Sequence, residues 1–102
     1  MAYNIVLKKR ALENLWEAMD YYEKQSSGLE KRLMNEFFNR LNDLREHPER
    51  YGPIYKHFRR IPLKKFPYKI VFAIDEPRKR VVVLVLWHER RNTETLRGWL
   101  EE

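Results

Sequence analysis

Apolar side chains recur at helical spacing in the first half of the chain and in strand-like runs in the second. The segment Tyr3–Leu7 is short and rich in residues that favour strands. From about Lys9 to Lys24 the apolar residues fall on one face of a helix. They are Leu12, Leu15, Trp16, Met19 and Tyr22. These patterns predict a first strand followed by an amphipathic helix.

A second amphipathic helix is predicted after the break at residues 26–28. Its apolar stripe consists of Leu29, Leu33, Phe37, Leu41 and Leu44. Ser27, with Glu30 three residues later, matches a capping box at the start of this helix. Pro48 should end it near His47. Because the connection between the two helices is short, we expect an antiparallel helical hairpin.

The second half of the chain shows the alternation that is typical of strands. Phe58–Phe66 is predicted as a strand in which Pro62 requires an edge position or a bulge. Tyr68–Ile74 alternates, with its four even-numbered residues on one face. The turn Asp75–Lys79 then leads into Arg80–Trp87. That last run is apolar on both faces, as expected of a central strand that is covered on both sides.

A short last helix is predicted near the C-terminus, with Asn92 or Thr93 as its cap. Its apolar residues are Leu96, Trp99 and Leu100. The order β-α-α-β-β-β-α predicts an α+β fold, with the helical hairpin on one face of a small, mostly antiparallel sheet. The other face must be covered by the C-terminal helix or by a partner protein. In a domain of this size we favour the helix.

Length and composition restrict the classes of function. The 102 residues predict one domain, residues 1–102. With three glycines and no Gly-rich phosphate motif, nucleotide-binding folds are excluded, and without cysteine there are no disulfides or thiol nucleophiles. No apolar stretch approaches ~18 residues and the N-terminus has no signal-peptide pattern. We therefore expect a cytoplasmic protein with no membrane association.

The net charge of +6 comes entirely from the second half of the chain. Residues 1–50 contain nine basic and nine acidic residues, whereas residues 51–102 contain twelve and six. Six basic residues and no acidic residue lie between positions 56 and 69: Lys56, Arg59, Arg60, Lys64, Lys65 and Lys69. Arg90 and Arg91 form a second cluster. Such a surface attracts nucleic acid or an acidic protein, or it serves only to keep the protein soluble.

Neither a nucleophilic triad nor a metal site is predicted. The three histidines, His47, His57 and His88, lie in different segments. A zinc-binding HExxH motif starting at His88 would need a second histidine where Asn92 stands. Most carboxylates lie on the outer faces of the helices, where exposure to solvent explains them without glycosidase chemistry. We expect no metal and no cofactor.

The basic strand residues have the side-chain types that metal-free RNA cleavage requires, namely cations for the phosphate and a proton acceptor and donor. The candidates are Arg60, Lys64, Lys69, His88 and Arg90. However, strand alternation should send Lys64 and Lys65 to opposite faces, so the basic residues do not all converge. The alternative is a basic sheet edge with an ordinary histidine at the end of a strand.

Five segments, in the same order along nearly the whole chain, resemble the RelE/ParE toxin superfamily. They are Asp20–Glu23, Ser27–Leu29, His47–Gly52, Phe66–Phe72 and Val85–Asn92. The match is closest to the ParE-like, plasmid stabilisation branch. The resemblance implies two helices on an antiparallel sheet and a toxin of a type II toxin–antitoxin system. It also implies a cognate antitoxin whose C-terminal segment wraps around the toxin in a hetero-oligomer.

The two branches of the superfamily differ in their target. RelE-like members cleave mRNA in the ribosome, and their motif corresponds here to Arg60, Pro62, Lys69, Arg90 and Leu96. Three of these positions keep the charge, but Pro62 replaces a lysine and Leu96 replaces a tyrosine. Neither replacement can transfer a proton or bind a phosphate. The resemblance therefore implies the ParE-like branch, which inhibits DNA gyrase and arrests replication without catalysis.

Two sets of site residues follow from this interpretation. The gyrase-binding residues would be Lys64, Lys65, Lys69, Arg90 and Arg91. The alternative is a ribosome-dependent mRNA endonuclease. Its catalytic residues would be Arg60, Lys69, His88 and Arg90. A homologue that keeps the fold and the antitoxin but has lost toxicity is a third alternative.

Overall fold

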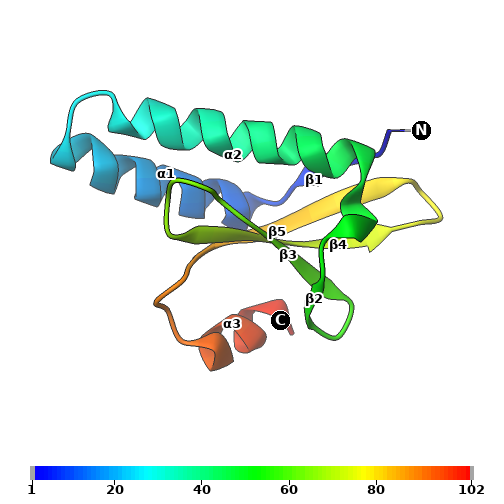
Figure 1. Cartoon of the computed structure of the whole chain (residues 1–102). Helices are drawn as coiled ribbons and strands as arrows, with labels where there is room; N and C mark the ends of the chain where they lie inside the picture. Colours follow the sequence, from blue (N-terminus) through cyan, green and yellow to red (C-terminus); the bar gives the residue numbers. More distant parts are fainter. Residues whose placement is uncertain (1, 102) are drawn as a thin grey trace.

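The sheet at the centre of the fold has helices on both of its faces (Figure 1). The computed structural model describes residues 2–101. Its elements are β1 (Asn4–Leu7), α1 (Lys9–Gln25), α2 (Leu29–Glu46), η1 (Pro48–Arg50), β2 (Pro53–Tyr55), β3 (Phe58–Pro62), β4 (Tyr68–Asp75), β5 (Arg80–His88) and α3 (Thr93–Leu100). The strand order is β1-β5-β4-β3-β2, with β1 parallel to β5 and the other neighbours antiparallel. The predicted α+β fold is confirmed.

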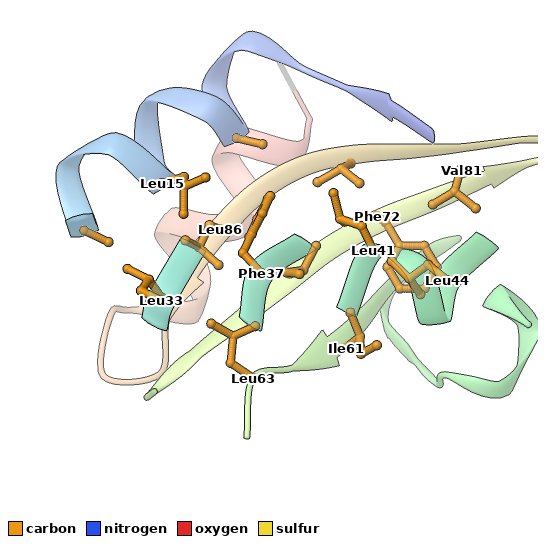
Figure 2. Packing of buried hydrophobic residues seen from close by; sticks show 14 of the residues in the cluster. Leu15, Leu33, Phe37, Leu41, Leu44, Ile61, Leu63, Phe72, Val81 and Leu86 are labelled. Atoms are coloured by element: carbon orange, nitrogen blue, oxygen red, sulfur yellow. The ribbon is translucent and has the colours of Figure 1, made fainter. Parts of the chain in front are cut away.

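The predicted helical hairpin is confirmed, and α1 and α2 pack side by side on one face of the sheet (Figure 1). Leu15 of α1 and the stripe Leu33–Leu44 of α2 point toward the strands (Figure 2). Phe37 and Phe72 are fully buried at this contact. Because truncating a buried phenylalanine typically costs about 3–5 kcal/mol, these rings are central to the stability of the layer.

The predicted capping box at the start of α2 is wrong. Gly28, not Ser27, is the N-cap residue, and no side chain caps the helix. Gly28 has a φ of 87°, a left-handed conformation that costs other residues about 1–2 kcal/mol. This backbone places the Ser27 side chain one residue too early to reach the first turn. The Glu30 carboxylate instead has one buried oxygen with no partner within residues 2–101.

The predicted strand Phe58–Phe66 is too long, because β3 ends at Pro62 and residues 63–67 form a loop to β4. β2 was not predicted. It is only three residues long and pairs with β3 at Arg59 and Phe58. Pro62 lies beyond the end of β2, so its missing N–H is not needed for a ladder on that side.

The second face of the sheet is covered by α3 (Figure 1). This confirms the prediction that the C-terminal helix, and not a partner protein, covers that face. A second buried cluster forms here from Phe58, Val71, Val85, Trp87 and Leu96. Asn92 begins the helix, since its side-chain oxygen accepts from the Glu94 N–H at 2.6 Å. Within residues 2–101 no helix has both the length and the hydropathy of a membrane span.

One extra residue in β5 reverses the direction of its side chains. Phe72 lies opposite Val83 and Val71 lies opposite Val85, so one step in β4 matches two steps in β5. This is a β-bulge at Leu84. Before the bulge, the odd-numbered Val83 faces the helical hairpin; after it, the odd-numbered Val85 faces α3.

The N-terminal segment is tied to the β4–β5 turn. The Tyr3 hydroxyl donates to the Glu76 carboxylate at 2.7 Å, and the Lys79 ammonium lies 3.2 Å from the same group. The Asn4 N–H donates to the Lys79 carbonyl at 2.9 Å. The hydrogen bond from Tyr3, followed by that from Lys79, lowers the pKa of Glu76. Hydrogen bonding to Arg80 similarly lowers the pKa of Asp75.

These shifts predict that the chain loses stability in acid. Because the pKa of Glu76 is lower in the folded chain than its ordinary 4.5, the unfolded chain binds the proton first. The stabilisation is therefore complete above the ordinary value and is lost as pH falls through the folded value. Tyr3→Phe removes the donor, so its free energy of unfolding should fall less steeply between about pH 5 and pH 3 than that of the wild type. Urea titrations across this range measure the difference, and parallel curves would contradict it.

Candidate functional site

Four basic residues lie at the end of the sheet where β3 and β5 end and β4 begins. Lys64 and Lys65 belong to the β3–β4 loop, and Arg90 and Arg91 follow β5. The Glu89 N–H donates to the Pro67 carbonyl at 2.8 Å and so joins the two loops. We call these four residues, which come from separate segments, the basic end. Within residues 2–101, no ion pair uses any of their side chains.

The β3–β4 loop is held against α2 by Glu36. The Glu36 carboxylate accepts hydrogen bonds from the backbone N–H groups of both Lys64 and Lys65, the latter at 3.1 Å. Both lysine side chains are exposed. The prediction that Lys64 and Lys65 alternate on a strand is therefore wrong, since they lie in a loop that a carboxylate positions.

Arg60 and Lys69 lie on the face of the sheet that α3 covers. Lys69 is opposite Pro62 and Trp87 in the two neighbouring strands and is only 6% exposed. Arg60 is exposed, and alternation along β3 places it on the same side as Phe58. The two cations are diagonal neighbours in the β3–β4 ladder, so the structure brings them together.

His88 lies on the opposite face, beside α1. It lines a pocket of about 240 Å³ whose other polar or aromatic residues are Asn14, Glu17, Tyr21, Tyr68 and Arg91. The bulge at Leu84 explains this position, because it turns His88 toward the helical hairpin and Trp87 toward α3. The structure thus separates His88 from Arg60 and Lys69 by the thickness of the sheet.

The imidazole of His88 is already engaged. Its Nδ1 accepts the Arg90 N–H at 3.0 Å, so the proton of the neutral ring lies on Nε2. The ring packs edge-on against Tyr68 with 5.0 Å between centroids. Burial, and then Tyr22, raises the pKa of Tyr68 to about 12, so this phenol is protonated at neutral pH. Neither side chain offers a free base in this arrangement.

Arg91 has a contact that the sequence analysis missed. Its guanidinium lies 4.3 Å from the Trp87 ring centroid and 4.8 Å from that of Trp99. The two indoles meet edge to face at 5.0 Å, and Arg10 lies 4.5 Å from the Trp99 centroid. Arg91 therefore helps to hold α3 on the sheet. In the sequence, two tryptophans lie within eight residues of Arg91 and hint at this contact. Only the fold brings Trp99 to Arg91.

The Trp87 indole N–H is buried and no group within residues 2–101 accepts from it. Nor does any cluster of three or more His, Asp or Glu side chains in this part of the chain form a metal site.

A sequence model described as the ParE toxin of the type II toxin–antitoxin system ParDE matches residues 5–93. The chain belongs to this family. It is accordingly a toxin of a type II toxin–antitoxin system, as the resemblance in the sequence implied. No curated protein matches it significantly.

Solved structures share the fold of this ParE-family toxin at low sequence identity. One comes from the chromosomal ParDE system of P. aeruginosa, with 12% identity and a TM-score of 0.69 over 85% of this chain and 96% of that one. A mutant E. coli RelE in the free state has 19% identity and a TM-score of 0.66, over 99% of this chain and 97% of that one. A chain of the RelBE2 toxin–antitoxin complex of Mycobacterium tuberculosis has 18% identity and a TM-score of 0.57, over 86% of this chain and 99% of that one.

The neighbours Arg90 and Arg91 should differ in their effect on stability. Arg91→Ala removes a cation that contacts two indoles and should lower the free energy of unfolding by about 1 kcal/mol. Arg90→Ala, at a side chain with no such ring contact, should leave it within about 0.5 kcal/mol of the wild type. Chemical denaturation followed by tryptophan fluorescence measures both, and equal losses would contradict the assignment of Arg91.

Proposed function

We propose that this ParE-family toxin binds DNA gyrase and arrests replication without catalysing a reaction. The observation that carries the proposal is the separation of His88 from Arg60 and Lys69 on opposite faces of the sheet. Acid–base catalysis requires its groups within hydrogen-bond reach of one reacting centre. A binding function requires only an exposed, complementary surface, and the basic end supplies one.

Two further positions support a non-catalytic function. Leu96, which stands where the nuclease motif has a tyrosine, is buried in the contact between α3 and the sheet. Pro62, which stands where that motif has a lysine, has no cation to offer beside Lys69. The face that holds Arg60 and Lys69 therefore carries positive charge, but positions 62 and 96 supply no proton donor or acceptor.

The ribosome-dependent endonuclease is kept as a second candidate because Arg60 and Lys69 are diagonal neighbours on one face. Such a pair suits the stabilisation of a phosphate. In that case His88 would have to leave its hydrogen bond to Arg90 and reach the other face of the sheet, which the β5 backbone prevents without local rearrangement.

We also propose a cognate antitoxin as the neutralising partner, in a toxin–antitoxin hetero-oligomer. Relatives of the same fold were solved as toxin–antitoxin complexes, among them RelBE of E. coli and RelE–RelB of Pyrococcus horikoshii. A segment that wraps around the toxin can cover the basic end and the exposed aromatic residues of the helices, Trp16, Tyr21 and Phe38.

Induced expression in bacteria tests the function directly. DNA, RNA and protein synthesis are pulse-labelled in the minutes after induction. DNA synthesis should stop first. If protein synthesis stops first, the endonuclease is correct; if growth continues, the chain is an inactive homologue or its target is absent from that host.

Arg90 should contribute to inhibition of gyrase. Arg90→Ala is expected to raise the concentration needed to inhibit supercoiling by about tenfold, the effect of losing ~1.4 kcal/mol of binding free energy. Lys9→Ala removes the same charge from an exposed position at the start of α1 and serves as the matched control. Equal inhibition by both variants would remove Arg90 from the binding surface.

His88→Ala separates the two candidate functions. A gyrase inhibitor that uses the basic end should keep its inhibition within about twofold, because the ring faces α1 and only its Nδ1 contacts Arg90. An endonuclease that depends on His88 should lose about 100-fold or more of its cleavage rate. Supercoiling and ribosome-dependent cleavage assays on the same preparation measure both quantities.

A further inference from the structure

A groove of about 780 Å³ runs between α2 and the β3–β4 loop. Polar and charged side chains line its rim: Arg32, Asn35, Glu36, Asn39, Arg40, Asp43, Lys64 and Lys65. Tyr22, Leu29, Phe66 and Pro67 supply its apolar part. The groove adjoins the basic end through Lys64 and Lys65, but it extends along α2, beyond the residues that the proposed function has used so far.

The carboxylates of the groove are already occupied by the protein itself. Asp43 lies 2.9 Å from the Arg40 guanidinium, whose Nε also donates to the Pro62 carbonyl at 3.1 Å. Glu36 accepts the backbone N–H groups of the β3–β4 loop. In contrast, the side chains of Arg32, Lys64 and Lys65 are exposed and form no ion pair within residues 2–101.

Two features of the groove favour a peptide. Asn35 and Asn39 are exposed and one helical turn apart on α2, and their amides can both donate to and accept from a peptide backbone. Tyr22 and Leu29 line the groove, are half-buried and form an apolar part on which a side chain can pack. The unpaired cations beside them complement acidic side chains.

Nucleic acid fits the same groove less well. Phe66 is only 9% exposed, so it presents no open ring on which a base could stack. The carboxylates of Glu36 and Asp43 also lie among the cations, where they would repel a continuous phosphate backbone. A peptide carries its carboxylates at separate positions, so they can lie beside the cations and away from those two acids.

We propose that this groove binds an acidic peptide segment that carries an apolar side chain and belongs to the protein target of the toxin. The inference rests on the proposed function, since it names the chemistry of the segment through which that target is held. Lys64 and Lys65 pair with its carboxylates, the amides of α2 bind its backbone, and the apolar side chain packs on Tyr22 and Leu29.

Labelled peptides test the chemistry of the groove. The probes are an octapeptide of alternating acidic residues and leucine, the same peptide with serine for leucine, and a single-stranded oligonucleotide of equal charge. Fluorescence anisotropy with the full chain should show at least about fivefold tighter binding of the leucine peptide than of either other probe. Equal binding of the two peptides, or tighter binding of the oligonucleotide, would overturn the proposal.

A matched pair of variants tests whether the peptide binds in this groove. Lys64→Ala/Lys65→Ala should weaken the leucine peptide about tenfold and lose inhibition of supercoiling to a similar degree. Lys8→Ala/Lys9→Ala removes the same charge from two exposed positions at the start of α1. It should change neither peptide binding nor inhibition of supercoiling. Equal losses in both variants would mean that only the net charge matters.

The outcomes separate this inference from the function on which it rests. If the wild type does not inhibit gyrase, the proposed function fails and the inference fails with it. If the wild type inhibits and Lys64→Ala/Lys65→Ala inhibits equally well, only the inference fails. If that variant still inhibits but is no longer neutralised by the cognate antitoxin, the groove belongs to the antitoxin and the inference is overturned.

Discussion

The β-bulge at Leu84 determines which side chains reach which face of the sheet, because it reverses the alternation of β5 halfway along the strand. Trp87 is thereby placed under α3, where it anchors that helix, and His88 is placed beside α1. A regular strand would exchange the two. The tryptophan would then lie beside the helical hairpin, and the imidazole would lie on the same face as Arg60 and Lys69. The covered second face and the argument against catalysis both depend on this one residue.

The elements that could be predicted from the sequence are those with a strong local pattern. Both long helices, the β4–β5 turn and the doubly buried β5 follow from periodicity and turn residues, and the structure confirms them. The bulge could not be predicted, since a run of Val and Leu looks the same in either register. β2 is too short for a pattern, and the cap of α2 depended on a left-handed Gly28 rather than on a side chain.

The candidate site was less predictable, because its side chains are positioned by contacts between distant segments. Glu36 is 28 residues from Lys64, and no local motif indicates that its carboxylate fixes the β3–β4 loop. Trp99 reaches Arg91 only because α3 folds back onto the sheet. Lys69 was predicted as a gyrase-binding residue, and its burial follows from a position between two strands that only the register reveals.

The excess of basic residues in the second half of the chain is therefore not one uniform surface. Arg59 donates to the Tyr51 carbonyl at 2.7 Å, Arg80 pairs with Asp75 at 3.0 Å, and Arg91 lies against two indoles. These contacts fix the positions of the three arginine side chains and stabilise the fold, and only Arg80 has its charge paired with a carboxylate. The side chains that remain exposed and without an ion pair around the groove and the basic end are few. A target must then be recognised through the spacing of a small number of cations beside an apolar contact, which makes recognition depend on geometry more than on net charge.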